Sequence, residues 1–169
     1  MSTSDPLAIP FGGVRLRFDS AKGYDDLVAA VLADIGEEPV PIDDIAVRFD
    51  TWESYEREME SRTGASGFML FATLNHGGWI KKAGIDRKAL RVVLGNPLIA
   101  ITMLRHDVTA GLFAPVELLI TEEPEGRSGL TYVVPSSLMV VEPNEPLREA
   151  ALELDAKLAA LATKVTATS

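Results

Sequence analysis

The residues best suited to chemistry in this sequence are Asn75 and His76, which end an apolar run and precede Gly77-Gly78. An imidazole can act as a general base or bind a metal or cofactor, and bare glycine backbone lets a ligand approach closely. A second interpretation stays open, in which the imidazole only hydrogen-bonds to the turn and fixes it. We therefore predict a ligand site at this point and assign no catalytic residue.

Two more polar side chains are candidates for the same site. Asn96 follows a second apolar run, in Gly95-Asn96-Pro97, and faces the same end of the sheet as His76 if both strands end there side by side. Lys81 is close in sequence to His76 and offers a cation to a carboxylate or a phosphate. Structural alternatives stay open, because Gly-Asn-Pro is common where a turn leads into a helix and a lysine pair usually covers a solvated face. The predicted ligand-binding residues are Asn75, His76, Lys81 and Asn96.

Other kinds of site are excluded or unsupported by the composition. The chain has no cysteine, which excludes disulfides, zinc–thiolate sites, iron–sulfur clusters and cysteine nucleophiles. His106 is the second of two histidines and has no partner at helical spacing, so we predict no metal site. The sequence contains no Gly-x-Ser-x-Gly, Gly-x-Gly-x-x-Gly or phosphate-loop lysine motif, and it identifies no cofactor.

The charge balance limits the partners that we expect. The chain has 169 residues, which suits one domain, and its 25 acidic and 16 basic residues give a net charge of −9. Such a chain repels a phosphate backbone, so nucleic acid is not an expected partner. No apolar run reaches the about 20 residues that span a bilayer, and residues 1–10 lack the regions of a signal peptide. We expect a cytoplasmic protein without a membrane partner.

The run over residues 67–76 is the expected centre of the fold. It starts on a glycine and continues through seven largely apolar positions, which is typical of a central strand buried on both faces. Alternating or apolar runs predict further strands over 14–18, 45–49, 90–94, 116–121 and 129–134. Helical spacing of apolar residues predicts helices over 25–35, 52–64, 98–105 and 147–164. This order of elements indicates an α+β fold.

An ordered set of motifs over residues 65–163 resembles the family catalogued as domain of unknown function 302. The motifs are Gly67 to His76, Gly95-Asn96-Pro97, Ala110-Gly111-Leu112 with Ala114-Pro115, and the hairpin 116–134 before a last helix. The chain departs from the family at Asn75, where an aspartate is usual, and at Ala114, where a leucine is usual. The resemblance implies a two-layer α+β fold, with a mostly antiparallel sheet of four to five strands covered by helices. It also implies a dimer as the common state, and no assigned activity.

We expect residues 1–13 to form a flexible arm and residues 14–165 to form a single α+β domain. Within the domain, residues 37–64 resemble a helical insert found in longer members of the family. Trp52, Tyr55 and Met59 lie on one stripe of that insert. One hypothesis is therefore a structural or interaction subunit that uses this stripe as its contact surface.

The favoured hypothesis is a small-molecule binding or sensing module that acts as a homodimer and takes an anion or an apolar acid. The ligand would enter an apolar hollow between the sheet and the helices, with the polar residues at its mouth. The alternative is an enzyme that uses His76 as a general acid or base, with Glu117 or Lys81 as the second titratable group.

Overall fold

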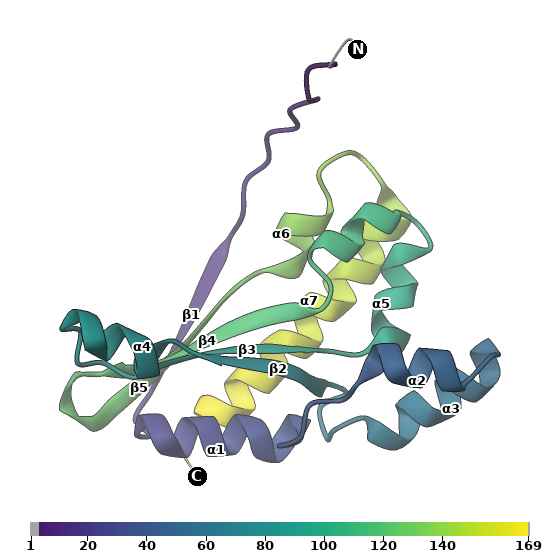
Figure 1. The fold of residues 1–169 in the computed structure, drawn as a ribbon. Coiled ribbons are helices and arrows are strands. Elements are labelled where there is room, and N and C mark those ends of the chain that lie inside the picture. Colours follow the sequence, from purple (N-terminus) through teal and green to yellow (C-terminus); the bar gives the residue numbers. More distant parts are fainter. Residues whose placement is uncertain (1–3, 169) are drawn as a thin grey trace.

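Five strands form one antiparallel sheet in the computed structural model, which describes residues 4–168 (Figure 1). The strand order across the sheet is β1-β5-β4-β3-β2, and each neighbouring pair is antiparallel. The strands are β1 (Arg15–Ser20), β2 (Met69–Asn75), β3 (Ala89–Gly95), β4 (Val116–Glu123) and β5 (Arg127–Val133). The expected α+β fold with a mostly antiparallel sheet is confirmed.

Seven α-helices lie within the described residues, together with three short 3₁₀ helices. The α-helices are α1 (Tyr24–Ile35), α2 (Ile42–Arg48), α3 (Trp52–Arg62), α4 (His76–Ile80), α5 (Pro97–Leu104), α6 (Pro135–Met139) and α7 (Glu145–Thr166). The 3₁₀ helices are η1 (Lys81–Ala83), η2 (Val108–Leu112) and η3 (Pro124–Gly126). None of the helices over residues 4–168 has the length and apolar character needed to cross a membrane.

One face of the sheet is covered by α1 and α7, which lie side by side across it (Figure 1). Successive strand residues point to opposite faces, so the even-numbered residues of β4 and β5 point at these helices. Leu118, Ile120 and Leu130 are accordingly buried. The helix α7 supplies the apolar stripe that its sequence predicts, with Leu147, Ala151, Leu154, Leu158 and Leu161 all buried.

The prediction that residues 67–76 form a central strand is wrong, because β2 lies at an edge of the sheet and pairs with β3 alone. The run is covered on both sides only near its start. Phe68 and Leu70 face the main core, whereas Met69 and Phe71 belong to a second, smaller cluster. The remainder of β2 is exposed from Ala72 onward. Because two separate apolar clusters cover the two sides of this short segment, its sequence has the same apolar pattern as a central strand.

The second cluster is built by α2 and α3, which pack beside β2 (Figure 1). The predicted strand over 45–49 is wrong, since these residues belong to α2 and its C-terminal end, with Ile45 buried. Met59 of the predicted contact stripe is fully buried, and Tyr55 packs against the same cluster. Trp52 is 47% exposed. The stripe is therefore mainly a core-facing surface, with one exposed aromatic ring at its start.

Candidate functional site

A hollow of about 650 Å³ lies on the face of the sheet opposite α1 and α7. The odd-numbered residues of β1, β4 and β5 and Arg91 of β3 point toward it. The register aligns Arg17 with Thr131, Thr131 with Leu119, and Leu119 with Arg91, so these four form one row across four strands. The expected hollow between the sheet and the helices is thus wrong in its placement, since the main hollow is on the other face.

The hollow has a polar end and an apolar end. The hairpin end of β4 contributes Thr121 and Glu123, with Arg17 and Arg87 beside them. The start of β4 contributes Val116, and Phe113 and Leu138 lie at the same end. Leu119 and Thr131 are on the floor between the two ends. A ligand in this hollow meets two arginines and Glu123 at one end, and apolar side chains together with Arg15 and Glu117 at the other.

The charge of the hollow is opposite to that of the whole chain. Four of the ten arginines line it, namely Arg15, Arg17, Arg87 and Arg91, but only two of the 25 acidic residues do, Glu117 and Glu123. Four positive and two negative charges leave the hollow at +2, although the chain carries −9. Local charge of this sign attracts anions, and guanidinium groups are suited to carboxylate and phosphate oxygens.

The four guanidinium groups differ in whether they already form an ion pair with an acidic side chain of the protein. Nε of Arg91 donates to Oε2 of Glu117 over 3.0 Å, and both side chains are partly exposed. Arg17 and Arg87 both approach Glu123. Arg15 forms no ion pair or side-chain hydrogen bond with any residue between 4 and 168, so its charge is the least committed of the four.

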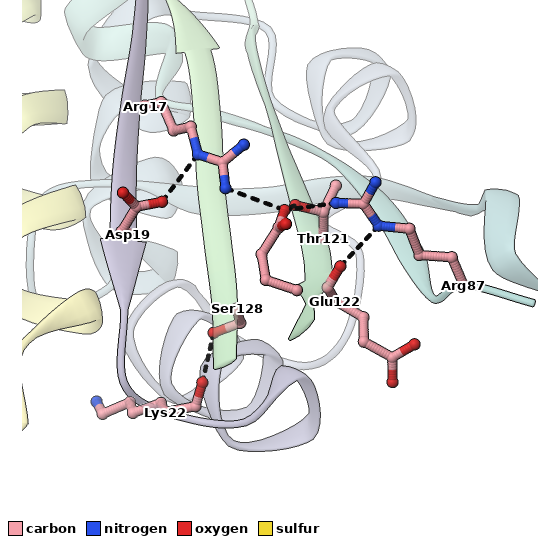
Figure 2. A network of polar contacts seen from close by, with 8 residues as sticks. Arg17, Asp19, Lys22, Arg87, Thr121, Glu122 and Ser128 are labelled. Atoms are coloured by element: carbon pink, nitrogen blue, oxygen red, sulfur yellow. Dashed lines mark hydrogen bonds and ion pairs between the residues drawn. The ribbon is translucent and has the colours of Figure 1, made fainter. Parts of the chain in front are cut away.

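The Glu123 carboxylate lies among Arg17, Arg87 and Thr121, which come from three separate segments. We call the space among these three side chains the seat. Oε1 of Glu123 lies 3.2 Å from a terminal nitrogen of Arg17 and 2.6 Å from one of Arg87, and it accepts a hydrogen bond from the Thr121 hydroxyl over 2.8 Å. Figure 2 shows the two guanidinium groups, from β1 and from the segment before β3, pointing toward each other across β4 and β5. The Thr121 hydrogen bond and the charges of Arg87 and Arg17 hold the pKa of Glu123 below its ordinary value, against the effect of desolvation.

His76 lines this hollow from the first position of α4 and is half-buried. Its Nδ1 accepts a hydrogen bond from Nε1 of Trp79 over 3.3 Å, and Trp79 is 57% exposed. Asn75 is exposed and caps α4, where its Oδ1 accepts from the Gly78 N–H over 3.2 Å. His76 is therefore the predicted residue that meets the hollow, and Asn75 holds the turn that places it.

The other two predicted ligand residues lie elsewhere. The expectation that Asn96 and His76 share one end of the sheet is wrong, because β2 and β3 are antiparallel and Asn75 pairs with Leu90, at the start of β3. Asn96 caps α5 at the far end, among side chains that leave only about 20 Å³ of space between sheet and helix. Lys81 is exposed in η1 and does not line the hollow.

The arginines of the hollow are the residues that the sequence reasoning missed. A signal for three of them was present, since Arg15 and Arg17 alternate with apolar residues and Arg91 interrupts the apolar run 90–94. Such positions place a charge on one face of a strand. No local signal identifies Arg87, which reaches Glu123 across 36 positions of sequence. Within residues 4–168, no cluster of three or more acidic or histidine side chains is arranged to hold a metal ion.

Residues 45–165 match the family described as "Domain of unknown function DUF302". The chain belongs to the DUF302 family. A similar solved structure is the crystal structure of an uncharacterized conserved protein DUF302 from Bacillus stearothermophilus, with a TM-score of 0.63 and 17% sequence identity. The similarity covers 90% of this DUF302 chain and 98% of that one, and at this identity it shows the fold alone. No match is found among curated proteins.

Proposed function

We propose that this DUF302 protein binds a small organic anion in the hollow on the open face of its sheet. The observation that carries the proposal is the placement of four arginines and His76 around one hollow in a chain of net charge −9. A volume of about 650 Å³ falls in the range of small-molecule sites, about 300–1,000 Å³. A chain that repels anions overall therefore places four of its ten arginines around one hollow.

The floor of the hollow supports an anion that carries an apolar body. Val133 lies opposite Arg15 and Leu119 lies opposite Arg91 on neighbouring strands, and Phe113 and Leu138 line one end. Ligand sites commonly combine apolar walls with a few polar groups that fix orientation. An inorganic ion would leave these apolar walls without contact, so an organic acid suits the site better.

An acid–base enzyme has less support. Within the described residues, Trp79 is the hydrogen-bond partner of the His76 side chain, and no titratable side chain is bonded to it. Glu117, the candidate second group, is paired with Arg91. A general base needs the proton that it removes within hydrogen-bond reach. Binding therefore accounts for these residues with fewer requirements than catalysis does.

The homodimer also remains a proposal. Exposed apolar side chains near the rim of the hollow support it, with Leu112 at 80% and Leu74 at 49% exposure. Static light scattering of the full chain over a range of concentrations tests it. A mass of one chain at every concentration would end the dimer proposal and leave anion binding unaffected.

Calorimetric titration of the full chain with octanoate, benzoate, succinate and phosphate tests the anion proposal. We expect binding of at least one organic acid, with loss of about tenfold or more in affinity when Arg17 and Arg87 are both changed to alanine. Arg57→Ala is the matched control, because Arg57 is exposed on α3, away from the hollow. Absence of binding for every acid in the wild-type protein would refute the proposal.

A further inference from the structure

We infer that the bound anion is a carboxylic acid with an extended apolar body, and that its carboxylate replaces the Glu123 side chain between Arg17 and Arg87. The inference rests on the proposed function and adds the ligand class and the position of its charged group. Glu123 is then an internal competitor that holds the seat when no ligand is bound.

The contacts of Glu123 show that the seat is built for one anionic oxygen. Arg17, Arg87 and Thr121 all reach the same atom, Oε1, at 3.2, 2.6 and 2.8 Å. Within the described residues Oε2 has no such partner. The three donor groups point their positively charged hydrogens at one position, so they would repel one another if no anion lay between them. The seat therefore requires a carboxylate oxygen, and either Glu123 or a ligand can supply it.

The other hydrogen bonds of the two arginines keep the seat in place when Glu123 leaves. Nε of Arg17 donates to Asp19 over 2.8 Å, and Nε of Arg87 donates to the backbone carbonyl of Glu122 over 2.7 Å. Each guanidinium group thus uses one edge for its own anchor and presents a terminal nitrogen to the seat (Figure 2). Such anchoring reduces the rotamer entropy that a ligand must restrict.

The apolar part of the ligand follows from the competition. Glu123 is tethered, so an external carboxylate faces a resident group at a high effective concentration, of order millimolar or more. A small acid such as acetate has nothing to offset this disadvantage. A longer acid continues along the hollow toward Leu119, about 13 Å from Glu123 along β4 at the usual rise per residue. Each methylene that leaves water there improves affinity by about fourfold.

Glu123→Gln tests the inference directly. Glutamine keeps the size of the side chain and can still accept from Thr121, but it removes the charge that competes for the two arginines. We expect calorimetric titration to show octanoate binding about tenfold more tightly to Glu123→Gln than to the wild type. Glu125→Gln is the matched control, because Glu125 is exposed in the same hairpin and forms no ion pair or hydrogen bond with Arg17, Arg87 or Thr121. We expect its affinity to equal that of the wild type.

Matched probes and a second variant separate the two ends of the ligand. Octanamide keeps the alkyl chain without the charge, acetate keeps the charge without the chain, and we expect both to bind at least tenfold more weakly than octanoate. Arg87→Ala should weaken octanoate by a similar factor, and Arg15→Ala should change its affinity less than threefold. If Arg87→Ala does not fold, Arg87→Lys, which keeps the charge but loses the planar donor fork, replaces it.

The outcomes distinguish the inference from the proposed function. If the wild type binds octanoate and Glu123→Gln binds it no more tightly, the displacement of Glu123 is refuted and anion binding stands. The same holds if Arg15→Ala abolishes binding while Arg87→Ala does not, because the carboxylate would then lie at the apolar end. If neither the wild type nor Glu123→Gln binds any of the organic acids, both the inference and the proposed function fail.

Discussion

The ammonium group of Lys164 lies 2.7 Å from Oδ2 of Asp34, whose side chain is only 2% exposed. The Ser66 hydroxyl donates to the same oxygen over 2.7 Å, and the Ser66 N–H donates to Oδ1 over 3.1 Å. One buried carboxylate thereby joins α1, α7 and the segment that leads into β2. These three parts are far apart in the sequence. We therefore expect this contact to contribute strongly to the packing of α1 and α7 on the sheet.

Loss of the Asp34 carboxylate should destabilise the protein. Asp34→Ala leaves Lys164 and both Ser66 donors without their acceptor, and we expect the free energy of unfolding to fall by about 3 kcal/mol. Urea unfolding followed by circular dichroism measures the change. Asp26→Ala, at an exposed position of the same helix, should cost less than about 0.5 kcal/mol. Equal effects of the two substitutions would contradict the role assigned to Asp34.

The same contact makes stability depend on pH at the acidic end. Burial raises the pKa of Asp34, but hydrogen bonds from Lys164 and Ser66 outweigh it and keep the pKa below the ordinary 3.8. The unfolded chain therefore binds this proton more readily than the folded one, so the stabilisation is complete above pH 3.8 and is lost as the pH falls through the folded pKa. Unfolding of wild type and Asp34→Asn from about pH 6 to about pH 2.5 tests the sign. The difference in stability between them should shrink as the pH falls, and a constant difference would contradict it.

Asn96 should affect stability and leave ligand binding unchanged. Its Oδ1 accepts from the Leu98 N–H over 2.9 Å, and its Nδ2 donates to the Gly67 carbonyl over 3.0 Å. We expect Asn96→Ala to cost about 2 kcal/mol, because it removes a helix cap and leaves the half-buried carbonyl of Gly67 without this donor. Asn75→Ala, at the exposed cap of α4, should cost less than about 1 kcal/mol. Loss of octanoate binding in a folded Asn96→Ala protein would restore Asn96 to the ligand site.

The sequence predicts most elements because their signals are local. Alternation over 14–18 locates β1, the Gly95-Asn96-Pro97 turn marks the start of α5, and an apolar stripe at helical spacing locates α7. Each of these signals needs only the residues of one element. The confirmed α+β fold follows from their order.

The sequence does not predict which strands become neighbours, and the site depends on that order. The run 67–76 looks central because Phe68 and Met69 meet two different clusters, and only the fold shows that β2 is an edge strand. Arg17 and Arg87 look like ordinary surface charges until β1 and β3 are placed on either side of β5 and β4. The expected ligand residues lie at or after strand ends, and of these four His76 alone lines the hollow, which extends across the middle of the sheet.

Gly64 should tolerate no side chain. A Cβ at this position would lie 2.2 Å from the carbonyl oxygen of Asp34 and 2.6 Å from that of Phe68, and both are backbone atoms. We expect Gly64→Ala to lower the free energy of unfolding by about 3 kcal/mol or more, since the segment before β2 must move away from α1. Gly12→Ala is the control, because a Cβ there meets nothing within 4 Å, and its unfolding midpoint in urea should match the wild type. A wild-type midpoint for Gly64→Ala would show that this close approach is not needed.

The two histidines allow ligand binding to be located without a label. His76 lines the hollow and is bonded to Trp79, whereas His106 is exposed after α5 and does not line it. Titration with octanoate should therefore shift the proton NMR signals of the His76 ring and leave those of the His106 ring in place. His76→Gln and His106→Gln assign the signals, and Trp79 fluorescence in a Trp52→Phe background provides a second report from the same rim. Saturating octanoate that shifts both rings equally, or His106 alone, would place the ligand outside the hollow.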